Sequence, residues 1–102
     1  MVSIPYQYHM NNIQAKLFKA ELDPNLPTLD LHGFYPDEAI DKLELFLFEN
    51  HQSNPPAGGT TLRIIYGGGT GKLKEKVLEY LKNHQLVDTI KDEGGSCILI
   101  LG

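Results

Sequence analysis

The stretch PTLDLHG, residues 27–33, carries a carboxylate and an imidazole two residues apart. Successive side chains of a β-strand point to opposite faces of the sheet, so Asp30 and His32 would lie side by side on one face. Imidazole is the side chain that most readily gains and loses a proton near neutral pH, so His32 could act as a general acid or base. Asp30 could orient His32 or hold a divalent cation. A structural role, in which the pair fixes the following turn, stays open.

A second candidate site is the segment IIYGGGTGKL, 64–73, whose pattern predicts a strand, a glycine loop and the start of a helix. Backbone N–H groups at such a helix start form an anion site, and Lys72 and Lys74 stand beside it. The segment is not a Walker loop, because Tyr66 and Leu73 replace its first glycine and its Ser or Thr. It is not a dinucleotide motif either, because Lys72 replaces the third glycine. The alternatives are a phosphate-binding loop and a plain flexible connector.

The charge distribution leaves nucleic-acid binding open. The chain of 102 residues has a formal net charge of −4, which by itself gives no support to a nucleic-acid partner. Residues 63–82, however, hold five basic residues against two acidic ones, so a local basic face is permitted.

Other kinds of site find little support in the sequence. The single cysteine, Cys97, lies in an apolar run, which favours a core residue over a nucleophile. One cysteine allows no internal disulfide, so we expect a reducing, cytoplasmic setting. The four histidines form no zinc-binding pattern. No apolar run is long enough to span a bilayer and no secretory signal is evident, so we expect no membrane partner.

The hydrophobic pattern predicts one α/β domain over residues 27–102, preceded by an N-terminal arm over 1–26. The arm contains a short helix, about 10–22. The domain then follows in β-α-β-α-β-β order, with strands at about 28–32, 62–66, 86–92 and 97–101 and helices at about 36–50 and 72–84. This order predicts a two-layer α/β sandwich with a four-stranded, mostly parallel or mixed sheet, in which the helical crossovers join parallel neighbours.

Two apolar residues do not fit the inward face of the first predicted domain helix. That face carries Ala39, Leu43 and Leu47, whereas Leu45 and Phe48 fall on the opposite side. Either the N-terminal arm covers them, or they form a surface for a protein partner or a second copy of the chain.

Three motifs in order resemble one family. LDLHG at 29–33 with EA at 38–39 is similar to the opening motif of the Smr (small MutS-related) domain. YGGGTGKL at 66–73 is similar to its second signature, a strand ending in H-G-x-G or T-G-x-G before T-G-x-L. EGGSCILIL at 93–101 is similar to its last glycine-rich turn and apolar strand. The resemblance covers about residues 28–102.

Smr domains occur in MutS2-type proteins, in plant organellar RNA-binding proteins and as standalone proteins, and many cleave DNA or RNA. The resemblance therefore implies a nucleic-acid-binding domain with nicking endonuclease activity and a fold like the C-terminal domain of bacterial translation initiation factor three. Ligands of parallel α/β sheets gather at the carboxyl ends of strands, where both motifs end. The expected catalytic residues are Asp30 and His32. The expected phosphate-binding residues are Tyr66, Gly67, Gly69, Thr70, Gly71, Lys72 and Lys74.

The motif departs from the family at Tyr66, where Smr domains have His or Thr, and at Gly68, where they often have a basic residue. We expect Tyr66 to donate a hydrogen bond to phosphate or to stack on a base. A Mg²⁺ or Mn²⁺ ion could assist, with Asp30 as its one protein ligand and phosphate and water as the others. No nucleotide or organic cofactor is expected. The alternatives are a non-catalytic nucleic-acid-binding module and a protein-interaction domain.

Overall fold

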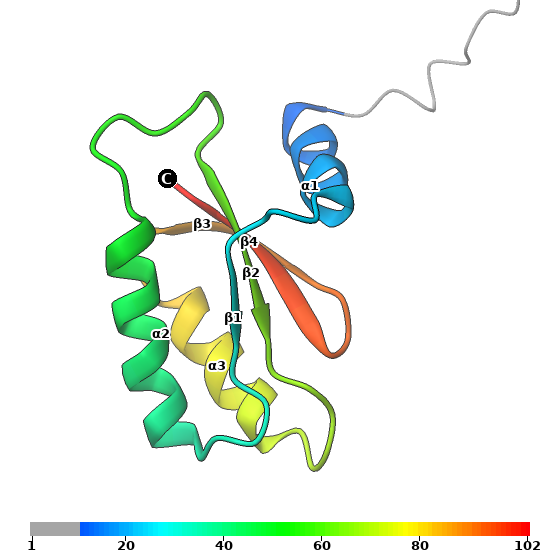
Figure 1. Ribbon diagram of the computed structural model, residues 1–102, viewed down its shortest axis with the longest axis vertical. Helices are drawn as coiled ribbons and strands as arrows, with labels where there is room; N and C mark the ends of the chain where they lie inside the picture. The colour runs from blue at the N-terminus through cyan, green and yellow to red at the C-terminus, as the bar shows by residue number, and fades with distance from the viewer. Residues whose placement is uncertain (1–10) are drawn as a thin grey trace, which may run out of the picture.

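A computed structural model describes residues 11–102 of the chain (Figure 1). The elements are α1 (Asn12–Leu22), β1 (Thr28–Asp30), α2 (Pro36–Asn50), β2 (Thr60–Ile65), α3 (Lys72–Lys82), β3 (Val87–Asp92) and β4 (Ser96–Leu101). They follow the predicted order, and their ends lie within a few residues of the predicted ones; residue 10 of the predicted first helix is outside the described part. None of the helices in residues 11–102 has the length and apolar character needed to cross a membrane.

The four strands form one mixed sheet in the order β1-β2-β4-β3, which confirms the predicted α/β class. β1 and β2 are parallel neighbours, as predicted for the first crossover. The second crossover is different: β2 and β3 run in the same direction, but β4 lies between them and is antiparallel to both. This order follows from burial, because β4 is apolar and almost wholly buried whereas β3 alternates with polar residues at the edge.

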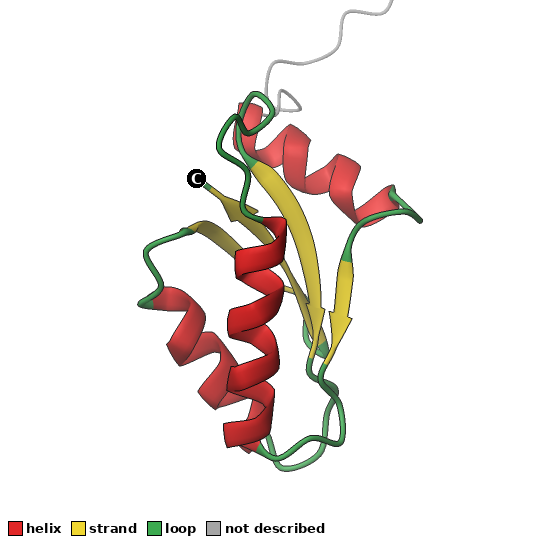
Figure 2. Cartoon of the chain, turned by 60° about the vertical axis from the view of Figure 1, so that its left-hand side comes forward, coloured by secondary structure: helices red, strands yellow, loops and turns green. Residues whose placement is uncertain are grey.

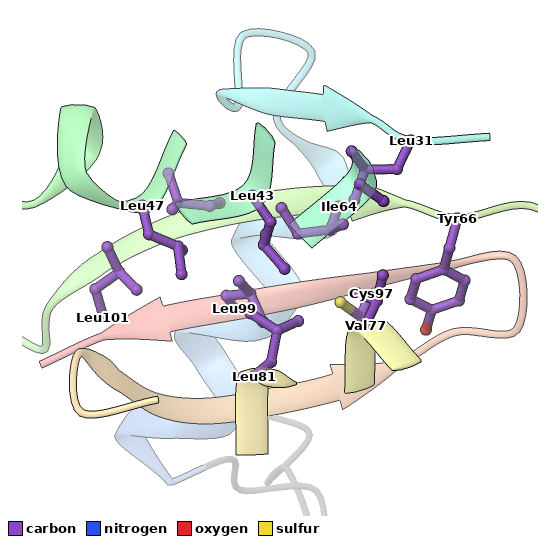
Figure 3. Packing of buried hydrophobic residues seen from close by; sticks show 12 residues of the cluster. Leu31, Leu43, Leu47, Ile64, Tyr66, Val77, Leu81, Cys97, Leu99 and Leu101 are labelled. Carbon is purple, nitrogen blue, oxygen red and sulfur yellow. The ribbon is translucent and has the colours of Figure 1, made fainter. Parts of the chain in front are cut away.

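The main core lies between one face of the sheet and the helices α2 and α3, which pack against each other (Figure 3). Its fully buried side chains include Leu43 and Leu47 of α2, Val77 and Leu81 of α3, and Leu99 of β4. Burial of each large side chain contributes about 1.5–3 kcal/mol to stability. This core holds the start of both helices, and hence both candidate loops, at one end of the sheet.

α1 lies on the opposite face of the sheet from α2 and α3 (Figures 1 and 2). Leu17 and Ala20 pack there with Ile98 and Ile100 of β4. The described part of the N-terminal arm therefore does not cover Leu45 and Phe48, which are exposed on α2, contrary to the first alternative considered for them. The pattern of an amphipathic helix shows which of its sides is buried but not which face of the sheet receives it.

Candidate functional site

The two sequence motifs meet at the carboxyl ends of β1 and β2. Asp30 pairs with Ile65 in the parallel register, and the Leu31 N–H donates to the Ile65 carbonyl at 2.7 Å. Beyond the strands the chains stay close: a Cβ added to Gly67 would lie 3.2 Å from the His32 Cβ. The loops that leave these strands converge at one end of the molecule (Figure 2). The structure thus brings the Asp30–His32 pair and the glycine loop to one edge.

Asp30 and His32 form a hydrogen-bonded pair on the surface. The His32 Nδ1 lies 2.6 Å from Asp30 Oδ1, and the same oxygen accepts the His32 backbone N–H at 3.0 Å. These bonds, the side-chain one first, hold the pKa of Asp30 below its usual range. The His32 side chain is 70% exposed and that of Asp30 is 48% exposed. When the carboxylate accepts a hydrogen bond from the Nδ1–H group, the lone pair of the imidazole lies on Nε2. An exposed Nε2 lone pair is the arrangement of a general base.

The glycine loop adopts a left-handed backbone conformation that residues other than glycine rarely adopt. Gly69 and Gly71 have φ of 77° and 83°, and Gly71 is the N-cap of α3. The Lys72 N–H makes only a long contact, 3.4 Å, with the Thr70 hydroxyl. No described residue accepts a hydrogen bond from the N–H groups of Gly69, Thr70 and Gly71. These groups, at the positive end of the α3 dipole, can receive an anion.

Gly67 does not join this anion site through its amide. Its N–H donates to the Gly95 carbonyl at 2.8 Å, so it is already paired. Gly67 instead allows close packing, because its Cα and carbonyl carbon lie near Gly95 on one side and His32 on the other. The expected phosphate contact of Gly67 is therefore corrected to a packing role.

Tyr66 is buried, which contradicts its predicted exposure to phosphate or bases. The residue is 2% exposed, and Figure 3 shows its ring among the core side chains. Its hydroxyl donates to Asp92 Oδ1 at 2.5 Å and lies 2.9 Å from the Ser96 carbonyl. Burial, and then the hydrogen bond to Asp92, raise the pKa of Tyr66 above its usual value. Tyr66 is therefore a neutral anchor of the scaffold.

Asp92 is the residue that sequence reasoning missed. It accepts from Tyr66, from the Gly94 N–H at 3.0 Å and from Lys74 Nζ at 3.0 Å through its second oxygen. These contacts, the Tyr66 hydroxyl first, lower the pKa of Asp92 to about 2. The one signal in the sequence was an aspartate two residues before a glycine, which favours an Asx turn. Its partners on β2 and α3 are distant in sequence and gave no signal.

The basic residues of the 63–82 window do not gather on one face. The Arg63 guanidinium contacts the carbonyls of Ala20 and Glu21 on the α1 side of the sheet. Lys74 pairs with Asp92 and lies over the Tyr66 ring, 5.7 Å from its centroid. The Lys74 ammonium is therefore already paired with a carboxylate, which the sequence does not predict. Lys72 makes no ion pair with another described residue and remains the cation of the loop.

The described residues do not fit a resident metal ion. No group of three or more His, Cys, Asp or Glu side chains within residues 11–102 is placed to hold one. Asp30 would be a lone protein ligand, and its Oδ1 already accepts two hydrogen bonds from His32. A divalent cation at this edge would depend on phosphate oxygens and water for its other ligands.

Comparison with known proteins gives matches over most of the described chain. The family model described as "Smr domain" matches residues 29–100. Among individual proteins, the chain is similar to "Endonuclease MutS2" of Listeria innocua, with 39% identity over 82 residues, which are 76% of this chain and 10% of that protein. It is also similar to "Endonuclease MutS2" of Pelotomaculum thermopropionicum, with 32% identity over 79 residues, or 74% and 10%. The matched region thus spans about a tenth of these relatives.

Two solved structures share the fold. The Smr domain of Thermus thermophilus MutS2 superposes with a TM-score of 0.65 and 26% identity, covering 76% of this chain and 99% of that domain. The SMR domain of NEDD4-binding protein 2 superposes with a TM-score of 0.55 and 26% identity, covering 78% and 90%. The similarity therefore spans about three quarters of this chain and nearly the whole of each neighbour.

Proposed function

The chain belongs to the Smr domain family, and we propose that it binds DNA or RNA at the edge formed by its two motifs and cleaves a phosphodiester bond there. The observation that carries the proposal is the pairing of Asp30 with an exposed His32, next to a glycine loop with unpaired N–H groups. The names of the MutS2 relatives, which describe endonucleases, support the same reading. Because the matched region is about a tenth of those proteins, the proposal concerns this domain and does not extend to the activity of the full-length relatives.

Binding would begin with one phosphate group at the start of α3. The N–H groups of Gly69, Thr70 and Gly71 donate to its oxygens, and Lys72 supplies the charge. Lys74 takes no direct part, because it is held by Asp92. Such contacts do not read sequence, so binding would be governed by charge and by the shape of the nucleic acid.

Cleavage would use His32 as the proton-transfer group. Asp30 holds the Nδ1 proton, so Nε2 accepts a proton from water as the water oxygen bonds to phosphorus. The P–O bond to the leaving oxygen breaks, and the imidazolium returns the proton to that oxygen. The negative charge of Asp30 stabilises the imidazolium between these two steps. The loop N–H groups and Lys72 offset the charge that develops on the phosphate oxygens.

A second candidate is binding without cleavage. It is favoured by the burial of Tyr66, because this chain presents no side chain to substrate at the position where Smr domains have His or Thr. One imidazole would then serve both proton transfers, which limits the rate. The non-catalytic module would keep the loop contacts and lose only the chemical step.

The deciding experiment incubates the protein with supercoiled plasmid and with structured RNA, with and without Mg²⁺ or Mn²⁺, and follows nicked circles and RNA fragments. His32→Ala is compared with His51→Ala, a change at an exposed histidine at the far end of α2. We expect His32→Ala to lose about 10²- to 10⁴-fold in rate while His51→Ala keeps it.

Three other results would change the conclusion. Equal cleavage by His32→Ala and its parent would remove His32 from the mechanism. Binding without cleavage under every metal condition would favour the non-catalytic module. The absence of any nucleic-acid binding would overturn the proposed function as a whole.

A further inference from the structure

Two aromatic residues follow the candidate catalytic pair after one glycine. Phe34 and Tyr35 lie in the loop between β1 and α2, which leaves the sheet edge just after His32. Tyr35 is 78% exposed and Phe34 is 38% exposed. Tyr35 is the third residue after His32, so the two Cα atoms lie no more than about 11 Å apart. An exposed aromatic ring therefore stands within a short reach of the site.

The backbone of this loop is held while the Tyr35 ring is left exposed. The Phe34 N–H donates to the Leu31 carbonyl at 3.2 Å, and the Tyr35 N–H donates to the Glu38 side chain at 3.3 Å. The Phe34 ring already has a partner, because Lys42 Nζ lies 4.7 Å from its centroid. An anchored loop with an exposed ring loses little entropy when a flat ligand stacks on it.

The charge around Tyr35 favours a neutral ligand group over a phosphate. Asp37, Glu38 and Asp41 follow in the first turns of α2 and outnumber Lys42, so the net negative charge would repel a phosphate backbone. On the other side of His32, the glycine loop and Lys72 attract phosphate. A nucleotide held by its phosphate at the loop would keep its backbone away from α2, and a neighbouring base is the part that can approach Tyr35.

We propose that Tyr35 is a stacking platform for an unpaired nucleobase next to the phosphate held at the glycine loop. This inference rests on the proposed function and specifies its substrate: single-stranded nucleic acid, or a duplex with a frayed, looped or branched segment. Every base has a face that can stack, so the contact is tolerant of sequence, whereas a regular duplex hides its base faces. Tyr35 thus takes the stacking role that the sequence had suggested for Tyr66.

The chain contains no tryptophan, which allows a direct test. Tyr35→Trp and Phe48→Trp each introduce a single tryptophan, whose emission can be excited apart from that of the tyrosines. Phe48 has a matched exposure, 76%, and lies in α2 about 20 Å farther along. Each variant is titrated, without added metal, with a single-stranded oligonucleotide and with the same sequence as a duplex. We expect the single strand to quench the fluorescence of Tyr35→Trp but not that of Phe48→Trp. The duplex should quench Tyr35→Trp much less than the single strand does.

Affinity gives a second readout. Tyr35→Ala should weaken single-strand binding about 5- to 150-fold, the range that corresponds to one base stack. Tyr35→Phe, which keeps a stacking ring, should bind like the parent, and Phe48→Ala serves as the matched control. The salt dependence of Tyr35→Ala should equal that of the parent, because a stacking contact releases no counterions.

The outcomes separate this inference from the proposed function. If the parent binds nucleic acid but Tyr35→Ala binds equally well, the stacking site is wrong and the proposed function stands. Equal quenching of Tyr35→Trp and Phe48→Trp leads to the same conclusion. A preference of the parent for the duplex likewise overturns the stacking site alone. If the parent binds neither oligonucleotide, both proposals fail together.

Discussion

Two aspartates at the same end of the sheet differ in how many partners they bind. Asp30 has one partner residue, His32, and their side chains are 48% and 70% exposed. Asp92 has three partners, the Tyr66 hydroxyl, the Gly94 N–H and the Lys74 ammonium, which come from three separate segments. The first pair keeps an unused nitrogen facing solvent. The second cluster has its side-chain groups engaged with one another.

This difference separates reactive groups from supporting ones. A fully paired cluster fixes the segments that carry it, and here it joins the end of β2, the first turn of α3 and the β3–β4 turn. The glycine loop runs between the first two of these segments, so its ends are held in place. A reactive site such as Asp30–His32 needs a nitrogen lone pair that no other group of the protein occupies. Mutations at the two clusters should therefore change different measurements.

The largest expected effect is on cleavage, from Asp30→Asn. The amide oxygen can still accept a hydrogen bond from the Nδ1–H group of His32, but the neutral amide stabilises the imidazolium that forms during the reaction less than the carboxylate does. We expect the initial cleavage rate to fall about 10²- to 10⁴-fold, while the thermal midpoint at pH 7 falls only slightly, because the pair is exposed to solvent. Asp88→Asn, at an exposed aspartate of β3, is the control. A cleaving Asp30→Asn with the parent's rate would show that the pair has only a structural role.

At Tyr66 we expect a change in stability, whereas at Asp30 we expect a change in the cleavage rate. Tyr66→Ala removes a buried ring and the centre of the Asp92 cluster, and should lower the free energy of unfolding by about 3–5 kcal/mol. Tyr66→Phe removes one hydroxyl and should cost about 1 kcal/mol. Urea denaturation measures both, with His32→Ala as the exposed counterpart of nearly unchanged stability. If Tyr66→Ala were as stable as its parent, the ring would not be part of the core.

The Asp30–His32 pair could be predicted from the sequence, and the cluster of Tyr66, Asp92 and Lys74 could not. Alternation along a strand is a local pattern, and it placed Asp30 and His32 on one face. The same alternation puts Tyr66 on the face of Leu62 and Ile64, which are buried, but its place at the end of the strand, next to a glycine loop, favours exposure. Asp92, whose carboxylate accepts the hydrogen bond of the Tyr66 hydroxyl, lies 26 residues away. Contacts at that distance depend on the position of β4, which the order of elements alone does not give.

The two lysines beside the loop should differ in their effect on binding. Lys72→Ala removes a phosphate contact and should reduce the slope of log affinity against log salt by about 0.9. Lys74→Ala should leave that slope unchanged, because its charge is paired with Asp92. Filter or anisotropy titrations at several salt concentrations measure both. Equal reductions in the two variants would mean that Lys74 exchanges Asp92 for phosphate when nucleic acid binds.

The smallest expected effect is a pH dependence that belongs to Asp92. Its pKa is lowered from 3.8 to about 2 in the folded protein, by the Tyr66 hydroxyl first and then by Gly94 and Lys74. A carboxyl whose pKa is lowered by folding stabilises the folded state above its unfolded pKa, and this contribution is lost as the pH falls from about 4 to about 2. Asp92→Asn should therefore be less stable than the parent at pH 7, and the gap between their thermal midpoints should close over that acid range. Asp30, whose pKa is also lowered, is present in both proteins and cancels from the comparison. A gap that stayed constant from pH 7 to pH 2 would show that the charge of Asp92 does not hold these three segments together.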